Sequence, residues 1–167
     1  LYKTGNIHFV GCSNWIANLA RESNLNIAEK VHVIHNPIST DKFRLLNKTE
    51  SRNQFKLDSK KFVVLFSSAN LNDPRKGLNY LLETWHEIAN VDFQLILVGE
   101  AKQPLNIPKS IDFLHLGFLS DQLLINKAIC SADVFACPSQ EDNLPNTVME
   151  SLACGTPILA WDIGGLS

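Results

Sequence analysis

The sequence predicts an α/β fold, a doubly wound parallel sheet with helices on both faces. Segments with the composition of strands alternate along the chain with segments that have the periodicity of helices. The strand segments, such as FVVLF and FQLILVG, are apolar throughout rather than at every second position, which is typical of strands buried on both faces. A composition of 45% hydrophobic and 19% charged residues is that of an ordinary globular protein.

The first part of the chain carries weaker patterns than the rest. It is predicted to contain strands at 6–11 and 30–36, a helix at 13–23 capped by Ser13, a turn-rich connection at 37–43 and a short polar helix around 48–56. The polar region 37–60 is the expected boundary between the remnant of one domain and the beginning of the next.

From residue 61 the alternation becomes regular. Strands are predicted at 61–68, 92–99, 111–118, 133–139 and 156–162, and helices at 76–90, 120–132 and 146–155. The first of these helices presents one apolar face, made of Leu78, Leu81, Leu82, Trp85 and Ile88. Ser120 is the expected N-cap of the second helix, and Gly155 with Pro157 is expected to end the third.

Charge, length of apolar runs and cysteine spacing exclude several classes of protein. The net charge of −2, with scattered lysines and arginines, argues against a nucleic-acid binder. The apolar runs are shorter than the roughly 20 residues of a membrane helix. None of the four cysteines is paired as C-x-x-C, so we expect reduced thiols and a reducing, cytoplasmic location. His32 and His35 should point to opposite faces of a strand, so no metal site is predicted.

Both ends of the sequence suggest a fragment of a longer protein. The chain begins with Leu1, and its only methionine is Met149. Its last residues, WDIGGLS, lead from a predicted strand into a glycine turn without a closing element, so we expect the domain to be truncated at its C-terminus.

A basic loop follows the strand predicted at 61–68. Its sequence, NLNDPRKG, places Arg75 and Lys76 where a helix is predicted to begin. Cations are unfavourable at that end of a helix because the helix dipole is positive there. They become favourable when an anion lies between them and the free backbone N–H groups. Two solvated surface cations are an equally good interpretation of this loop taken alone.

An acidic stretch, EDNLPNTVMESLACGTP, occupies residues 141–157. Pro145 suits the first turn of a helix, and Asn143 or Asn146 could cap it. Asp142 would then lie in the loop before the helix, and Glu150 within it.

Val148 and Leu152 are expected to face the core of the domain from this helix. In the simple interpretation, Asp142 complements the dipole at the helix N-terminus, and Glu150 is a solvated residue on the helix surface. The functional interpretation is that both carboxylates line one cleft and accept hydrogen bonds from sugar hydroxyls, while the N–H groups at the helix start bind a phosphate. A nucleotide-sugar combines these groups.

These residues resemble the retaining glycosyltransferases of family 4, which have the GT-B fold of two facing Rossmann-like domains. The family carries the pattern E-G-x-P-N-x-x-x-E-A-x-A-C-G-x-P, and residues 142–157 read DNLPNTVMESLACGTP. DPRKG resembles the lysine-glycine of the family's donor site, VIHNPISTDKF its interdomain segment, and SNWIANLARES the helix before that segment. The resemblance covers nearly the whole chain and is strongest to bacterial enzymes that build capsule, exopolysaccharide or O-antigen chains.

The resemblance implies that the chain is the C-terminal, donor-binding half of a GT-B enzyme. Residues 1–45 would be the tail of the N-terminal acceptor domain with the interdomain linker, and residues 46–167 an incomplete Rossmann-like donor domain. The full enzyme would transfer a hexose from a nucleotide-diphosphate sugar to a growing glycan or lipid-linked glycan, with retention of configuration. The isolated fragment would be inactive, and the full protein would be cytoplasmic, with a peripheral position at the inner face of the plasma membrane left open.

The resemblance also implies roles for individual residues. It assigns catalysis to Lys76, which would contact the donor diphosphate, and to Asp142, which would face the donor sugar. Glu150 would bind the ribose, and Arg75 is a further candidate for the diphosphate. The backbone that would meet the sugar and phosphates belongs to Asn143, Leu144, Pro145, Asn146 and Thr147. No metal and no cofactor would be required.

Two departures from the family pattern leave alternatives open. The first acid is Asp142 where the family commonly has Glu, and residues 67–70 read SSAN where the family has a G-R pair. A non-catalytic GT-B nucleotide-binding domain would fit these departures, and a nucleotide-sugar epimerase shares the fold. A flavodoxin-like response regulator would need an acidic cluster that FSSANLN lacks.

Overall fold

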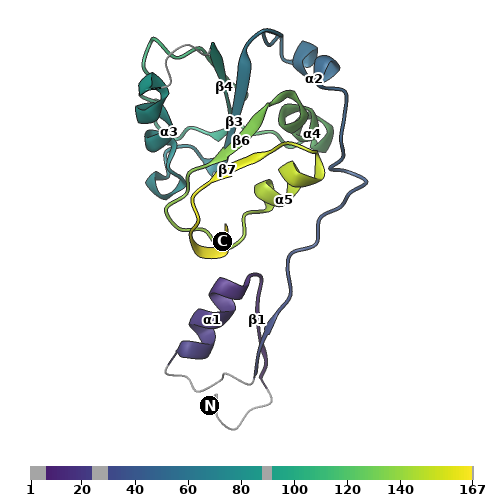
Figure 1. Cartoon of the computed structure of the whole chain (residues 1–167), viewed down its shortest axis with the longest axis vertical. Coiled ribbons are helices and arrows are strands. Elements are labelled where there is room, and N and C mark those ends of the chain that lie inside the picture. Colours follow the sequence, from purple (N-terminus) through teal and green to yellow (C-terminus); the bar gives the residue numbers. More distant parts are fainter. Residues whose placement is uncertain (1–6, 24–29, 88–91, 167) are drawn as a thin grey trace.

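The structure is a computed structural model that describes residues 7–23, 30–87 and 92–166 (Figure 1). Within these ranges the chain forms two parallel sheets, one of two strands and one of five in the order β5-β4-β3-β6-β7. The start of the strand predicted at 6–11 and the end of the helix predicted at 76–90, with Ile88, lie outside the described residues.

The five-stranded sheet places a crossover at its centre. Its strands are β3 (Phe62–Asn70), β4 (Phe93–Glu100), β5 (Phe113–His115), β6 (Val134–Cys137) and β7 (Ile158–Ala160), all parallel. From β3 the chain continues through β4 to β5 on one side of the sheet, and it then returns to place β6 on the other side of β3. The point at which the strand order reverses therefore lies between β3 and β6. In open α/β sheets this switch point is where ligands bind.

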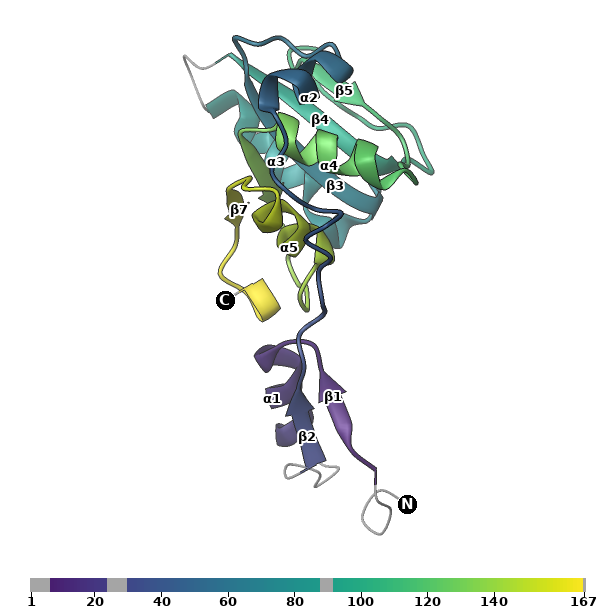
Figure 2. The same cartoon turned by 90° about the vertical axis from the view of Figure 1, so that its right-hand side faces the viewer.

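Helices cover both faces of this sheet, as the sequence predicts. α4 (Gln122–Ser131) and α5 (Asn146–Ala153) pack on one face, where Val63 and Leu65 belong to their core cluster. α3 (Leu78–Thr84) packs on the other face, against Val64 and Phe66. α2 (Lys48–Gln54) lies beside α4, and Figure 2 shows the two helices on the same side of the sheet. The alternation of side chains along β3 therefore supplies two cores from one strand.

Two helix starts differ from the prediction. The helix expected from residue 76 begins at Leu78, because Pro74–Lys76 form a 3-10 turn and Gly77 then adopts a left-handed conformation with φ of 78°. A second short 3-10 turn, Trp85–Glu87, continues α3. The cap of α4 is Asp121 rather than Ser120, since an Asp121 oxygen accepts from the amides of Leu123 at 2.7 Å and Leu124 at 3.4 Å. A carboxylate there also complements the helix dipole.

The first part of the chain forms a small unit of β1 (Phe9–Gly11), α1 (Asn14–Glu22) and β2 (Val31–Val33). Ser13 caps α1 as predicted, and its hydroxyl accepts from the amide of Ile16 at 3.3 Å. The two strands pair in parallel, with α1 as the crossover between them. We call this unit the β1–α1–β2 unit.

A segment without regular helix or strand, residues 34–47, joins the β1–α1–β2 unit to α2 and runs along the side of the large sheet that carries α4 and α5 (Figure 1). It packs there through Phe43, which is buried in the core cluster of α4 and α5, and through the Leu46 amide, which donates to the Cys130 sulfur at 3.4 Å. In the described part of the chain, no helix combines the length and the apolar character needed to cross a membrane.

Candidate functional site

The loops that follow β3 and β6 are joined at the switch point of the sheet. The amide of Gln140 donates to the carbonyl of Arg75 at 2.8 Å. Gly77 lies so close to Pro138 that an added Cβ would stand 1.9 Å from the Pro138 carbonyl oxygen. Only glycine tolerates both this approach and the positive φ at low cost. The contact brings the 3-10 turn that carries Lys76 against the loop that carries Asp142.

Lys76 and Asp142 form an ion pair across these two loops. Lys76 Nζ donates to Asp142 Oδ2 at 2.7 Å, and the two side chains are 32% and 14% exposed. The same oxygen accepts from Ser139 Oγ at 3.2 Å, and Asp142 Oδ1 accepts from the Asn143 amide at 3.1 Å. The Asp142 carboxylate is therefore fixed by three donors, while Lys76 remains accessible from the surface. Sequence reasoning did not single out Ser139, although a hydroxyl directly after a strand in a predicted site was a usable signal.

Arg75 is not brought to this ion pair. Its guanidinium donates twice to Asp73, at 2.8 and 3.1 Å, and the side chain is 74% exposed. These hydrogen bonds lower the pKa of the Asp73 carboxyl. Lys76 is thus the cation that contacts Asp142, whereas the guanidinium of Arg75 is paired with Asp73.

The helix that follows Asp142 begins without a side-chain cap. α5 has Pro145 at its N-cap position, and no side chain accepts from its first amides. The expectation that Asn143 or Asn146 caps α5 is wrong, because both amide groups are engaged elsewhere. Asn146 Oδ1 accepts from Asn36 Nδ2 at 3.0 Å, and Asn143 bonds to the β1–α1 turn. The first turn of α5 therefore has backbone N–H groups without a side-chain cap and the positive end of its dipole beside the small cavity that Pro145 and Thr147 line.

Glu150 occupies the second turn of α5 and is half-buried. Among the described residues, no group donates a hydrogen bond to its carboxylate, and burial raises the pKa of that carboxyl above 4.5. It lines a small cavity with Thr147 and Ser67, and a second small cavity shares both of those residues and reaches Lys76 and Asp142. Ser67 and Thr147 thus connect the two carboxylates into one continuous site.

Two neighbouring expectations for α5 had different outcomes. Val148 is buried in the core, as predicted, but Leu152 is 57% exposed, so its assignment to the core is wrong. Positions four residues apart on a helix share a face only approximately, because one turn takes about 3.6 residues. Gly155 adopts φ of 74° just beyond the helix and ends it as expected.

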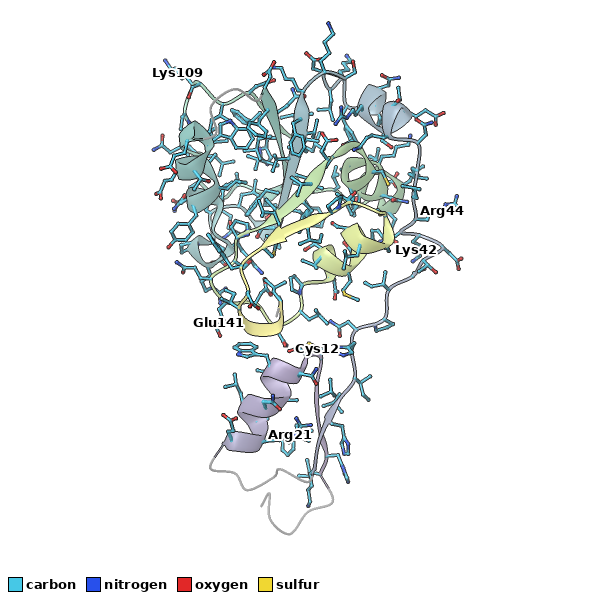
Figure 3. All side chains as sticks on the ribbon, viewed as in Figure 1. Cys12, Arg21, Lys42, Arg44, Lys109 and Glu141 are labelled. Carbon is cyan, nitrogen blue, oxygen red and sulfur yellow. The ribbon has the colours of Figure 1, made fainter. Side chains whose placement is uncertain are left out.

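The loop of Asp142 and Asn143 also touches the β1–α1–β2 unit. Ser13 Oγ donates to Asn143 Oδ1 at 2.6 Å, and Asn143 Nδ2 donates to the Cys12 sulfur at 2.9 Å. We call the five-stranded sheet with its helices, residues 48–87 and 92–166, the large unit. Figure 3 shows Cys12 at the end of the β1–α1–β2 unit that faces the large unit, with Glu141 on the facing side of the large unit. A cavity of about 470 Å³ opens at this junction between α1 and α5, lined among others by Trp15 and Leu144.

The remaining titratable residues do not gather into a metal centre. Within residues 7–23, 30–87 and 92–166, no group of three or more His, Cys, Asp or Glu side chains is placed to hold a metal ion. The four cysteines are free thiols, with Cys130, Cys137 and Cys154 buried. His32 stacks on His8, whereas His35 bonds to the Cys12 carbonyl, so the two do not share a ligand.

Comparison with known proteins supplies the family. Residues 61–167 match the family model described as glycosyl transferases group 1. The D-inositol 3-phosphate glycosyltransferase of Segniliparus rotundus is 28% identical over 150 residues, which are 83% of this chain and 33% of that protein.

Solved structures share the fold. Sucrose-phosphate synthase from Thermosynechococcus elongatus matches with a TM-score of 0.79 and 22% identity, over 95% of this chain and 41% of that one. Anabaena HepE, solved in complex with UDP and glucose, matches with a TM-score of 0.78 and 20% identity, over 95% and 45%. The chain spans less than half the length of these relatives. Because the matched region is most of the chain and contains Lys76, Asp142 and Glu150, the chain belongs to the family of glycosyl transferases group 1.

Proposed function

We propose that this chain is the donor-binding half of a glycosyltransferase that moves a hexose from a nucleotide-diphosphate sugar to a growing glycan. Residues 46–167 form the donor domain, and residues 1–45 are the tail of an acceptor domain with its linker. The transfer retains the configuration at the anomeric carbon and serves surface-polysaccharide synthesis in the cytoplasm.

The observation that carries this proposal is the half-buried Glu150 carboxylate, which lacks a donor among the described residues. A carboxylate held in that state is stabilised by a ligand that brings hydroxyl donors, and the vicinal hydroxyls of a ribose provide two. One turn away, the uncapped start of α5 and Lys76 offer positive charge to a diphosphate. Asp142 lies beside Lys76 and lines the same small cavity, so it is the carboxylate available to the donor sugar.

The chemistry follows from the electrostatics of this site. When the bond between the anomeric carbon and the diphosphate breaks, the electron pair leaves with the diphosphate, and negative charge grows there. Lys76 and the N–H groups of α5 stabilise that charge, so they supply what a metal supplies elsewhere. The acceptor hydroxyl attacks the same face of the sugar that the diphosphate leaves, and its proton passes to the departing diphosphate oxygen. Asp142 and Glu150 bind hydroxyls and form no covalent bond to the sugar.

The solved relative HepE supports a nucleotide-sugar donor, since it was crystallised with UDP and glucose. One observation favours a second candidate, a nucleotide-binding domain without catalysis. Arg75 is bonded to Asp73 and exposed, which leaves Lys76 as the single lysine or arginine at the Asp142 carboxylate among the described residues. Both the glycosyltransferase and the non-catalytic domain would bind the donor, so binding does not distinguish them. Sugar transfer by the full-length protein does.

Isothermal titration of the chain with UDP-glucose, GDP-mannose, ADP-glucose and the matching nucleoside diphosphates tests the proposal. We expect one nucleotide series to bind, with the same affinity in EDTA as in Mg²⁺, and no sugar transfer by the chain alone. If no nucleoside diphosphate and no nucleotide-sugar binds, the proposal is wrong. Transfer by the chain alone would contradict the assignment of two domains.

A further inference from the structure

The side chain of Asn143 joins the loop of Asp142 to a segment 130 positions earlier in the chain. Its carbonyl oxygen accepts from Ser13 Oγ at 2.6 Å, and its amide nitrogen donates to the Cys12 sulfur at 2.9 Å. Ser13 is itself fixed, because its hydroxyl oxygen also caps α1 by accepting from the amide of Ile16. The oxygen and the nitrogen of the Asn143 side chain are thus both directed to the β1–α1 turn.

The 3-10 turn Gly164–Leu166 also packs against this loop, and it lies beside Ser13 and α1. The Gly165 amide donates to the Asp142 carbonyl at 2.9 Å. A Cβ on Gly165 would stand 1.1 Å from the Asn143 carbonyl oxygen, so this turn touches the loop backbone directly. Residues 142 and 143 therefore contact two neighbouring segments, and of these two contacts only the one to the β1–α1 turn is made through the side chain of Asn143.

Both side-chain hydrogen bonds of Asn143 leave the large unit and end on the β1–α1 turn. The side chain does not cap α5, and it does not bond to Lys76 or to the Asp142 carboxylate. The direct link to the carboxylate is the Asn143 backbone amide, which donates to Asp142 Oδ1 at 3.1 Å. A shift of the Asn143 side chain therefore moves the amide that orients Asp142, while Glu150 on the second turn of α5 is not part of this link.

We propose that Asn143 is a positioning residue that fastens the Asp142 loop to the β1–α1 turn, so that affinity for the sugar end of the donor depends on the β1–α1–β2 unit. This rests on the proposed function, in which Asp142 faces the sugar. The nucleotide end depends on Lys76 and Glu150, which line two small cavities formed by residues of the five-stranded sheet and its helices.

A double-mutant cycle tests the link through its effect on two ligands. Asn143→Ala, Ser13→Ala and the double variant are titrated with UDP-glucose and UDP, or with the GDP-mannose and GDP pair if the parent chain prefers it. The loss of the α1 cap in Ser13→Ala occurs in both arms of the cycle and cancels. Ser13→Thr keeps the hydroxyl, and Asn79→Ala is the matched change at an exposed asparagine of α3.

Each single variant should bind the nucleotide-sugar roughly 2- to 10-fold more weakly, the range for one hydrogen bond, and bind the diphosphate as the parent does. The double variant should be no weaker than Asn143→Ala, and Ser13→Thr and Asn79→Ala should match the parent. The link is overturned if a single variant loses equal affinity for the nucleotide-sugar and the diphosphate, or if the losses of the two single variants add in the double variant. It is also overturned if the variants melt at a lower temperature but bind the nucleotide-sugar as the parent does. If the parent binds neither pair, the proposed function fails first and the link fails with it.

Discussion

Replacing Glu150 with glutamine should weaken nucleotide binding and stabilise the free protein at the same time. The change removes one negative charge and keeps the size of the side chain. In the free protein that charge is half-buried, and no described residue donates to it. In the proposed complex the carboxylate accepts from ribose hydroxyls. A hydrogen bond to a charged group contributes about 1.5–3 kcal/mol, so Glu150→Gln should weaken UDP and UDP-glucose alike by roughly 10- to 150-fold.

The effect of Glu150 on stability follows from the direction of its pKa. Burial raises the folded pKa above 4.5, so the folded state holds the proton more tightly than the unfolded chain does. The stability from this group is full below pH 4.5 and is lost as the pH rises through the folded pKa. Glutamine stays neutral at every pH. Glu150→Gln should therefore melt at a higher temperature than the parent at pH 7, and the difference should disappear in acid.

Titration calorimetry and thermal melting across this pH range measure both effects, with Glu83→Gln on the exposed surface of α3 as the matched control. The control should change neither quantity. If Glu150→Gln leaves both affinities unchanged, Glu150 is not a ligand residue. If it lowers the melting temperature at pH 7, the carboxylate has a stabilising partner and the reasoning from burial is refuted.

Four further changes follow from the same geometry. Lys76→Ala should weaken UDP about tenfold or more and leave uridine nearly unchanged, most clearly at low salt, as titration of both ligands would show; an equal loss would remove Lys76 from the diphosphate. Arg75→Ala, measured alongside, should change UDP affinity by less than about twofold, because an exposed surface ion pair contributes about 0–1 kcal/mol and the Arg75 guanidinium is bonded to Asp73. Asp142→Asn should spare UDP and weaken UDP-glucose by about 1–3 kcal/mol, whereas a purely structural role would lower only the melting temperature. Gly77→Ala should cost about 1–2 kcal/mol for the left-handed backbone alone, and more for the contact with Pro138, so an unchanged melting temperature would contradict the close approach of the two loops.

The architecture was predictable because burial determines it. Strands buried on both faces must be apolar throughout, and the segments FVVLF and FQLILVG form the central strand β3 and its neighbour β4. Local details were less predictable where two residues compete for one role. Ser120 and Asp121 are both good caps, and only the geometry of the loop selects Asp121. Leu152 fits the core face of α5 by spacing, but it is 57% exposed while Val148 is buried, since residues four apart share a helix face only approximately.

The candidate site was also predictable in its residue types but not in its contacts. The residue types and spacing of the acidic stretch indicated Asp142 and Glu150, but spacing could not show that one carboxylate is paired and the other lacks a donor among the described residues. The pairing of Lys76 with Asp142 depends on β3 and β6 being neighbours, which is a property of strand order rather than of either segment. The two asparagines expected to cap α5 instead contact the β1–α1 turn and the linker, and no local pattern reveals such distant partners.

The central claim is that a nucleotide-sugar binds at the carboxyl ends of β3 and β6. The most direct test is to follow the backbone amides of the isotope-labelled chain by nuclear magnetic resonance while UDP-glucose is added, with GDP-mannose and ADP-glucose as alternatives. We predict that the largest shifts fall on Ser67, on Lys76 and Gly77, and on residues 142–150, and that adding UDP alone shifts the same set except for Asp142 and its neighbour Asn143. Shifts confined to the apolar groove between α3 and β7, or no shifts with any of the three ligands, would contradict the claim.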